Sequence, residues 1–289
     1  MKPFVEIVEM GPRDGLQNEA TIIPTSQKIA LVNLLSDAGF RRIEVASFVS
    51  PRWVPQMADS GAVLAGIKRR SGVRYSALTP NLKGYEAARA ADADEVAIFA
   101  SASEGFSRAN LNCSIMESIV RFKPILDAAK ADNMKVRGYV SMVTDCPFDG
   151  PIAADAVARV VAALRDLGCY EVSLGDTVGR GTPDRIDAML GAVLNELPPD
   201  RLAGHYHDTG GRALENIEVS LARGLRVFDA SVGGLGGCPY APGAKGNVAT
   251  EAVDARLKAL GYDAGLDPVR LADASAWARA MVAGGPGVS

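Results

Sequence analysis

The chain of 289 residues is long enough for two average domains, but a single α/β barrel of about 250 residues also fits this length. Hydrophobic residues make up 48% of the sequence and charged residues 22%, a globular composition that excludes a disordered chain. Acidic residues number 34 and basic residues 31, so the net charge of −3 does not favour nucleic-acid binding. The four cysteines lack C-x-x-C spacing, which argues against a zinc cluster or a disulfide framework and suits a reducing cytosol.

No segment of the sequence predicts membrane insertion or export. The longest uncharged run, residues 230–244, is rich in Gly and Pro and cannot form a spanning helix. The N-terminal Met-Lys-Pro leads directly into a strand pattern, so we expect no signal or transit segment. From these features we expect a cytoplasmic protein.

Eight short β-rich runs alternate with helix-length segments along the chain. The runs are residues 5–10, 42–47, 73–78, 95–100, 135–141, 170–174, 202–207 and 226–232. Three glycines, Gly39, Gly168 and Gly224, lie where a helix should end and the chain should step into the next strand, a position that often takes a positive φ. This repeated unit predicts a (β/α)8 TIM barrel.

A doubly wound open sheet is the alternative fold, but its nucleotide-binding signatures are missing. Gly179-x-Gly181 lacks the third Gly of a dinucleotide fingerprint, and Ala244-Lys245 lacks the Gly that must precede the Lys of a phosphate loop. Glycines crowd residues 233–246, which predicts a lid or a binding loop.

The C-terminal part of the chain predicts a short helical extension. Residues 248–282 have a helical pattern and should pack on the outside of the barrel. We therefore expect residues 1–282 to form a single catalytic domain, followed by a flexible tail at 283–289.

The two histidines of the chain, His205 and His207, stand two residues apart at the end of the seventh expected strand. Residues at i and i+2 of a strand project to the same face, so the two imidazoles can bind one divalent cation. The alternative is a pair of surface histidines. Asp14 follows the first strand in Pro-Arg-Asp-Gly, where it can add a carboxylate oxygen, although this motif is also ordinary turn chemistry. In a TIM barrel such strand ends carry the chemistry.

Polar residues also interrupt other expected strands. Glu44, Arg137 and Tyr139 should face the barrel axis, because their apolar neighbours should face the helices. A buried carboxylate is costly unless it is paired or used. Glu44 could therefore pair with an inner arginine or take part in the chemistry. Both hold together if Glu44 orients an arginine that acts in the reaction. Asp176 ends the sixth strand, either as a functional carboxylate or as the N-cap of the next helix.

Two further residues, one a candidate for the chemistry and one a candidate metal ligand, complete the candidate site. Cys238 lies in the Gly-rich segment; a lone cysteine is usually inert, but beside a cation and an arginine its thiol could donate a proton or act as a nucleophile. Asn247, nine residues later, can offer an amide oxygen. With Asp14, His205 and His207 it makes a set of two imidazoles and two oxygens, which suits Mg²⁺ or Mn²⁺, with Zn²⁺ or Co²⁺ as substitutes.

Six segments of the chain match one known family. They are GPRDGLQNE (11–19), IEVASFVSPRWVPQMAD (43–59), TPNLKGYEAA (79–88), SLGDTVGRGTP (173–183), GHYHDT (204–209) and GLGGCPYAPGAKGNVATE (234–251). Together they resemble the 3-hydroxy-3-methylglutaryl-CoA (HMG-CoA) lyase family, across nearly the whole chain. The RDG and H-x-H pieces alone would indicate only the wider superfamily of metal-dependent lyases and synthases.

The resemblance implies a TIM barrel that uses Mg²⁺ or Mn²⁺ to cleave HMG-CoA to acetyl-CoA and acetoacetate, with Arg13 steadying the developing enolate oxygen. The implied metal ligands are Asp14, His205, His207 and Asn247. The implied catalytic residues are Arg13, Asp14, Glu44, Asp176, His205 and Cys238. The implied acyl-CoA contacts are Arg13, Gln17, Asn110, Arg137 and Tyr139. A homodimer with an acyl-CoA substrate, and with neither nucleic acid nor membrane as partner, completes the expectation.

Some positions depart from the family pattern and leave the acyl group open. Residues 142–148 differ from the usual C-L-G-C-P-Y stretch, and residues 210–212 differ from the usual Tyr-Gly-Gln. The alternatives are a lyase for a related substrate, such as a longer branched 3-hydroxyacyl-CoA or citramalyl-CoA, and a condensing synthase of the 2-isopropylmalate or homocitrate type. Such synthases usually carry an extra regulatory domain, for which the chain has no room. A barrel with a purely structural metal is the non-enzyme alternative, and it leaves the inward Glu44 and Arg137 unexplained.

Overall fold

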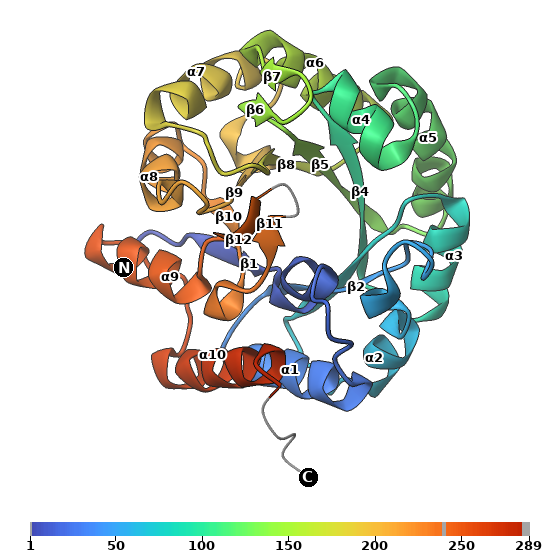
Figure 1. Cartoon of the computed structure of the whole chain (residues 1–289), viewed down its shortest axis with the longest axis vertical. Coiled ribbons are helices and arrows are strands. Elements are labelled where there is room, and N and C mark those ends of the chain that lie inside the picture. The colour runs from blue at the N-terminus through green and yellow to red at the C-terminus, as the bar shows by residue number, and fades with distance from the viewer. Residues whose placement is uncertain (1, 239–240, 285–289) are drawn as a thin grey trace.

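Eight parallel strands close into a barrel in the computed structural model, and helices surround them (Figure 1). The structure describes residues 2–238 and 241–284, and for 237–238 and 241–245 it describes the backbone only. The barrel strands are β1 (Glu6–Glu9), β2 (Arg42–Ser47), β3 (Arg74–Leu78), β4 (Glu95–Ser101), β5 (Lys135–Ser141), β8 (Glu171–Asp176), β9 (Leu202–Tyr206) and β10 (Val227–Ala230). The predicted TIM barrel is confirmed, and each expected run lies on one of these strands.

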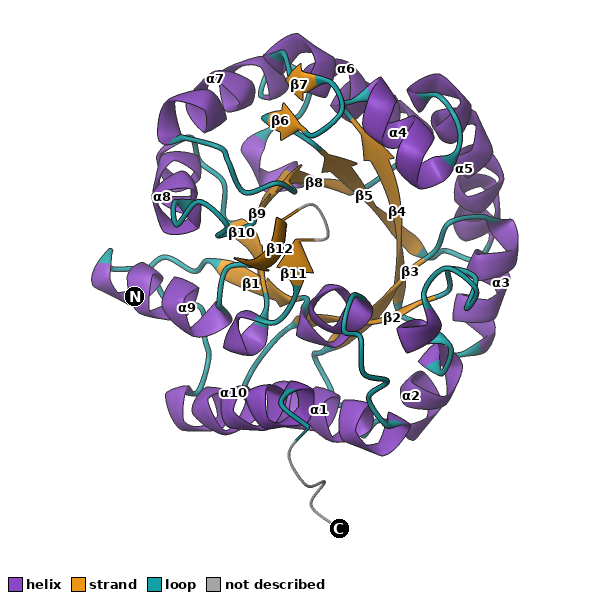
Figure 2. Cartoon of the chain, in the orientation of Figure 1, coloured by secondary structure: helices purple, strands orange, loops and turns teal. Residues whose placement is uncertain are grey.

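The barrel closes between its first and last strands. Residues Glu6–Glu9 of β1 pair in parallel with Val227–Ala230 of β10, and β1 also pairs with β2 on its other side. Helices follow the strands and surround them, as Figure 2 shows. They are α1 (Thr25–Asp37), α2 (Ser60–Gly66), α3 (Leu82–Ala90), α4 (Glu104–Leu111), α5 (Ile115–Ala131), α6 (Ala154–Leu167), α7 (Pro183–Val193) and α8 (Ala213–Ala222).

The glycines that were expected at helix ends have the expected backbone. Gly39, Gly168 and Gly224 have φ values of 103°, 106° and 96°. Only glycine reaches this region without steric cost, and the positive φ turns the chain from helix into strand.

The C-terminal extension is helical, but it consists of two helices. α9 (Thr250–Ala259) and α10 (Pro268–Val282) are separated by an irregular stretch, and α10 packs along α1 on the outside of the barrel (Figure 1). Asp267 caps α10 by accepting hydrogen bonds from the backbone N–H groups of Val269 and Arg270. Of the expected tail, residues 285–289 lie outside the described part of the chain.

The loops that carry the expected site contain short helical turns and hairpins. The chain leaves β1 in a π-helical turn, η1 (Gly11–Gly15), and leaves β10 in a 3-10 turn, η4 (Val232–Gly234). Two small antiparallel hairpins are β6 (Asp145–Cys146) with β7 (Gly150–Pro151) and β11 (Gly237–Cys238) with β12 (Ala241–Lys245). Two further 3-10 turns are η2 (Pro55–Met57) and η3 (Pro199–Arg201).

Apolar side chains fill the layer between strands and helices, whereas buried charges occupy the inside of the barrel. Arg42 of β2, 3% exposed, donates hydrogen bonds to Glu6 and Glu171. Arg137 of β5, 1% exposed, donates to Glu171 and to Asp229 of β10. Each buried arginine therefore has carboxylate partners, which compensates for its removal from water.

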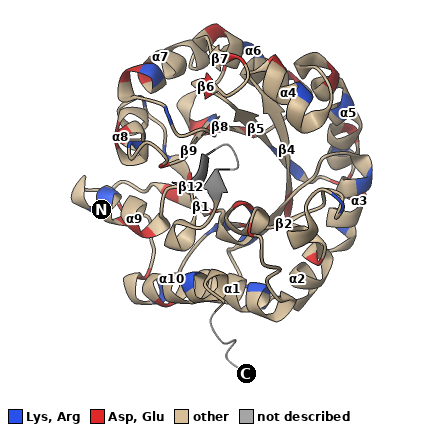
Figure 3. Cartoon of the chain, in the orientation of Figure 1, with Lys and Arg blue, Asp and Glu red and all other residues tan. Residues whose placement is uncertain are grey.

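The outer surface mixes both signs of charge over the helices, as Figure 3 shows. Within the described ranges, every helix is too short or too polar to cross a bilayer.

Candidate active site

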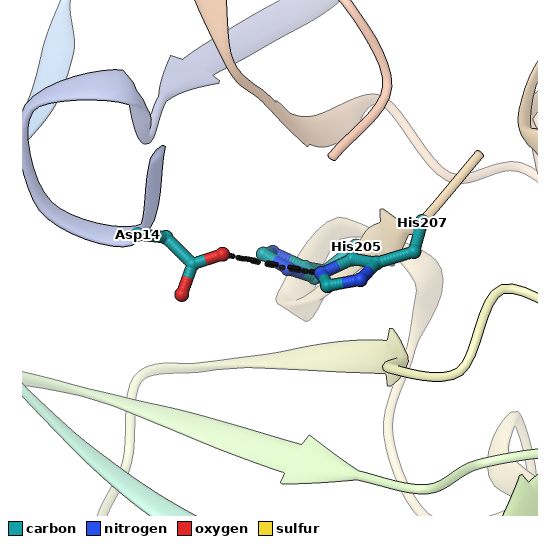
Figure 4. A group of neighbouring side chains, drawn as sticks. All are labelled: Asp14, His205 and His207. Atoms are coloured by element: carbon teal, nitrogen blue, oxygen red, sulfur yellow. Dashed lines mark hydrogen bonds and ion pairs between the residues drawn. The ribbon is translucent and has the colours of Figure 1, made fainter. Parts of the chain in front are cut away.

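Three side chains from two distant parts of the chain converge at the end of the barrel where the strands finish (Figure 4). Asp14 comes from η1, His205 from near the end of β9, and His207 from just beyond that strand. The Nε2 atoms of the two imidazoles are 3.4 Å apart, and Asp14 Oδ2 lies 3.8 Å from Nε2 of His205 and 3.9 Å from Nε2 of His207. The prediction that both imidazoles share one face of the strand is confirmed.

The electrostatics of this cluster suit a divalent cation. Burial, helped by the neighbouring His205, lowers the pKa of His207 to about 4, so this imidazole is neutral and keeps a lone pair at neutral pH. Burial alone would raise the pKa of Asp14, but Arg13 and the two histidines outweigh it and hold this pKa well below its usual range. An ionised carboxylate beside the neutral imidazole of His207, without thiolate, fits Mg²⁺ or Mn²⁺.

Asn247 lies beside the cluster, as expected. Its side-chain amide donates a hydrogen bond of 2.8 Å to Asp14 Oδ2, and its backbone forms a β-bridge with His207. Rotating the amide by 180° would turn its oxygen toward the same carboxylate, and a cation between the two oxygens would remove their repulsion. The position therefore suits the fourth ligand that the sequence predicts.

Arg13 is held on two sides. Its Nε donates to Glu44 and its Nη1 donates to Asp14, while the guanidinium lies 5.7 Å from the centre of the Tyr139 ring. Within the described residues, Nη2 of Arg13 makes no hydrogen bond, which leaves this nitrogen available to a ligand.

Glu44 faces the barrel axis, as its strand position predicts. It is 1% exposed, and its second oxygen accepts a hydrogen bond of 2.6 Å from the Tyr139 hydroxyl. The inner arginine that pairs with it is Arg13, so Glu44 orients the arginine next to the metal cluster. The expectation that Tyr139 points inward is also confirmed.

Arg137 points inward too, and protein groups occupy its guanidinium, so its expected contact with acyl-CoA stays a prediction. Its side chain forms ion pairs with Glu171 and Asp229 and donates to the Tyr139 hydroxyl. These partners occupy the guanidinium below the mouth of the barrel, and the residue is 1% exposed. The strand pattern gave its direction but not its depth along the strand.

Asp176 lies apart from the Asp14 cluster, and its catalytic role stays a prediction. Its register partner is Tyr206, whose hydroxyl bonds Ser220 of α8, so both lie on the helix-facing side of the barrel wall. The Asp176 carboxylate accepts hydrogen bonds from the Thr144 hydroxyl and the Gly181 N–H, which ties the loop after β8 to the loop after β5. It neither joins the Asp14 cluster nor caps α7, which begins after Thr182.

The remaining expected residues stand in three different situations. Gln17 is the second residue after η1, and its buried Oε1 has no hydrogen-bond partner within the described residues. Asn110 is exposed on α4. Cys238 belongs to β11, but its side chain lies outside what the structure describes.

The sequence reasoning missed Asp229, which accepts a hydrogen bond of 3.1 Å from Nδ1 of His205. The signal was present, since Asp229 alternates with apolar residues in the eighth run as Glu44 does in the second.

Two glycines allow η1 and the Gly-rich loop to approach closely. A Cβ on Gly15 would lie 2.8 Å from Cβ of Leu235, and a Cβ on Gly236 would lie 2.8 Å from Nδ2 of Asn247. The base of the β11–β12 hairpin is fixed next to the histidines, because Asp208 N–H donates to the carbonyl of Gly246 at 2.7 Å. The loop therefore begins and ends at the candidate metal site.

Comparison with known proteins agrees with this geometry. The HMGL-like family model matches residues 4–277. The 3-hydroxy-3-isohexenylglutaryl-CoA/hydroxy-methylglutaryl-CoA lyase of Pseudomonas aeruginosa is 56% identical over 270 residues, which cover 93% of this chain and 90% of the relative. The mitochondrial hydroxymethylglutaryl-CoA lyase of Gallus gallus is 55% identical over 269 residues, with 93% and 90% covered. The crystal structure of the HMG-CoA lyase from Brucella melitensis is 63% identical, covers 97% of this chain and 99% of its own, and superposes with a TM-score of 0.96. The chain therefore belongs to the HMGL-like family.

Proposed function

We propose that the protein is a divalent-metal-dependent lyase that cleaves HMG-CoA to acetyl-CoA and acetoacetate. The observation that carries this proposal is the convergence of Asp14, His205 and His207 next to Arg13. Support also comes from the HMG-CoA lyase of A. baumannii, which is 37% identical with a TM-score of 0.92 and whose structure is a complex with coenzyme A and 3-methylmalate.

The metal would be Mg²⁺ or Mn²⁺, held by Asp14, His205, His207 and Asn247. When bound, it supplies a positive charge that lowers the pKa of a ligated substrate hydroxyl. The protein residues themselves keep the ligand atoms in place: Arg13 fixes Asp14, and the bridge between His207 and Asn247 fixes the strand end against the loop.

The reaction is a retro-Claisen cleavage. A base in the neighbourhood of Asp14 and His205 removes the proton of the C3 hydroxyl. The oxygen electrons form the ketone of acetoacetate, the C2–C3 bond breaks, and its electrons pass to the thioester as an enolate. Arg13 stabilises the enolate oxygen through its Nη2, because Glu44 holds Nε and Asp14 holds Nη1. An acid, which we assign to Cys238, then protonates the carbon to give acetyl-CoA.

The Gly-rich loop would protect this enolate from water. Its ends are fixed beside the histidines and η1, so the β11–β12 hairpin is tethered at the mouth of the barrel. A cover at this position would keep solvent from quenching the enolate before the acid acts.

The experiment that tests the proposal is a product assay on metal-stripped protein. EDTA-treated protein is mixed with HMG-CoA, with and without Mg²⁺ or Mn²⁺, and both products are measured. We expect equal amounts of acetyl-CoA and acetoacetate, formed only with the metal. The His207→Ala variant should need a higher metal concentration for the same turnover. A folded, metal-loaded protein that forms neither product would contradict the proposal.

A second candidate substrate is a longer branched 3-hydroxyacyl-CoA. The P. aeruginosa relative carries 3-hydroxy-3-isohexenylglutaryl-CoA in its name. The chain also departs from the family pattern on the β6–β7 hairpin, where Phe148 is 53% exposed, and at Gly210, where a Cβ would lie 2.7 Å from the carbonyl oxygen of Gly179. The ratio of kcat/KM across a panel of acyl-CoAs decides between the two substrates.

Three broader features complete the proposal. Residues 1–282 would form one catalytic domain, which the family match over residues 4–277 supports. The protein would act as a homodimer in the cytoplasm, by resemblance to its family. Light scattering on the purified protein tests the homodimer, and cell fractionation tests the cytoplasmic location.

A further inference from the structure

His205 has a polar partner on each side of its ring. Its Nε2 faces Asp14 and His207, and its Nδ1 lies 3.1 Å from Oδ2 of Asp229. A neutral imidazole carries a proton on one of its two nitrogens. Only the other nitrogen then has a lone pair and can bind a metal. A carboxylate can accept a hydrogen bond but cannot donate one, and Asp229 therefore selects the form with the proton on Nδ1.

Asp229 is itself held rigidly. It is 2% exposed, and its Oδ2 accepts hydrogen bonds from Ser173 Oγ at 2.8 Å and Arg137 Nη1 at 3.0 Å, while its Oδ1 accepts from Arg137 Nη2 at 2.8 Å. Arg137 is fixed in turn by Glu171 at 2.7 Å. The carboxylate thus has one orientation, set by a two-point contact with a buried guanidinium.

His207 has no such support. Its Nδ1 is buried and has no hydrogen-bond partner within the described residues. The two imidazoles therefore differ in what sets their orientation and tautomer. A carboxylate partner fixes His205, whereas only packing and the strand end fix His207.

We propose that Asp229 is the positioning residue of the metal centre: it fixes the proton of His205 on Nδ1 and aims the Nε2 lone pair at the point shared with Asp14 and His207. Arg137 serves this role indirectly by orienting Asp229. The inference deepens the proposed function, because it rests on the metal centre proposed above. Asp229 touches no substrate in this arrangement, so it acts through His205.

The first test reads the tautomer directly in the unmutated, metal-free protein. Because the chain has two histidines, [15N]histidine labelling gives four ring nitrogens in a long-range 1H–15N NMR spectrum. The His207→Gln variant leaves a single imidazole and so assigns the signals. We expect a protonated Nδ1 and an unprotonated Nε2 for His205 near pH 8. A protonated Nε2, or an even mixture of the two forms, would overturn the proposal.

The second test measures Mn²⁺ affinity from the electron paramagnetic resonance signal of free Mn²⁺. Asp229→Ala should weaken binding about 10–100-fold, the usual effect of losing such a partner. Asp229→Asn should weaken it less, because the amide oxygen can still accept from Nδ1. Ser173→Ala is the matched control: it removes a different hydrogen bond to the same carboxylate, and we expect its affinity to stay within about threefold of wild type.

The outcomes separate this inference from the proposed function. If wild-type protein binds no Mn²⁺, the metal centre itself is wrong. If wild type binds and a folded Asp229→Ala binds equally well, or if Ser173→Ala weakens binding as much, the positioning role is wrong. Should Asp229→Ala fail to fold by circular dichroism, because Arg137 is left without its partner, Asp229→Asn and the tautomer measurement decide the question.

Discussion

The two ends of the barrel interior use similar residue types for different purposes. Toward the beginning of the strands, Arg42 and Arg137 alternate with carboxylates, and each arginine has carboxylate partners. Toward the end of the strands, Asp14 and two imidazoles direct their ligand atoms at one another. Burial of polar groups is therefore common to both ends, and convergence of ligand atoms distinguishes the functional one.

The largest expected effect tests this comparison by removing a charge near the beginning of the strands, where ion pairs compensate the buried arginines. Arg42→Met leaves Glu171 and the half-buried Glu6 without their shared partner, which should lower the free energy of unfolding by about 3–5 kcal/mol. Urea unfolding measures the loss. At low temperature, where the variant is folded, its Mn²⁺ affinity should match wild type, since the bonds of Arg137 to Asp229 remain. A strong loss of metal binding would show that the two ends act as one unit.

A substitution at the other end of the strands changes the functional site alone. Arg13→Gln removes the group that faces the developing enolate, and turnover of HMG-CoA should fall about 10²–10³-fold. Saturating substrate and metal are used, so that kcat is what changes. Mn²⁺ should still bind, because Asp14 and the histidines remain. Turnover within tenfold of wild type would remove Arg13 from the catalytic residues.

A third prediction concerns Glu9, a buried carboxylate at the end of β1. Its carboxylate accepts hydrogen bonds from Gly11 N–H, Val232 N–H and the Thr250 hydroxyl. Burial raises the pKa of Glu9 to about 7, from an ordinary value of 4.5, against the opposing effect of these hydrogen bonds. Between pH 4.5 and 7 the folded chain holds a proton that the unfolded chain has released. Folding stability should therefore fall as the pH rises through this window.

The Glu9→Gln variant isolates this contribution. Glutamine stays neutral, and its amide can donate to the Thr250 hydroxyl while its oxygen accepts from the two backbone N–H groups. At pH 8 it should be more stable than wild type by roughly 3 kcal/mol, and at pH 4 the two should be equal. Unfolding in urea at both pH values gives the difference. An equal gap at the two pH values would mean that folding leaves the pKa of Glu9 unchanged.

The smallest expected effect tests the role of Asp176. Thr144→Val removes one hydrogen bond to this carboxylate and should cost about 1 kcal/mol of stability. Because Asp176 faces the helices, the pH profile of kcat should not move. A shifted profile would return Asp176 to the acid/base residues that the sequence predicts.

The repeating pattern of the chain was enough to predict the barrel, because eight runs of alternating character and glycines at helix ends leave few other closed arrangements. Side-chain direction was predictable from the rule that successive residues of a strand point to opposite faces, as at Glu44 and Tyr139. That rule was not applied to Asp176, whose register with Tyr206 turns it outward. The depth of Arg137 depends on how far neighbouring strands are staggered, and a single sequence does not give that stagger.

The closure of β1 onto β10 has a consequence for the order of events during synthesis. Asp14 and Asn247 are separated by 233 positions, and His205 lies between them. At ordinary elongation rates the ribosome needs about ten seconds or more to make that stretch, during which the first carboxylate has no imidazole to meet. A stalled or truncated chain that ends before β9 cannot assemble the site. Metal capture should therefore be among the last steps of maturation, and bound metal would report that the ring of strands has closed.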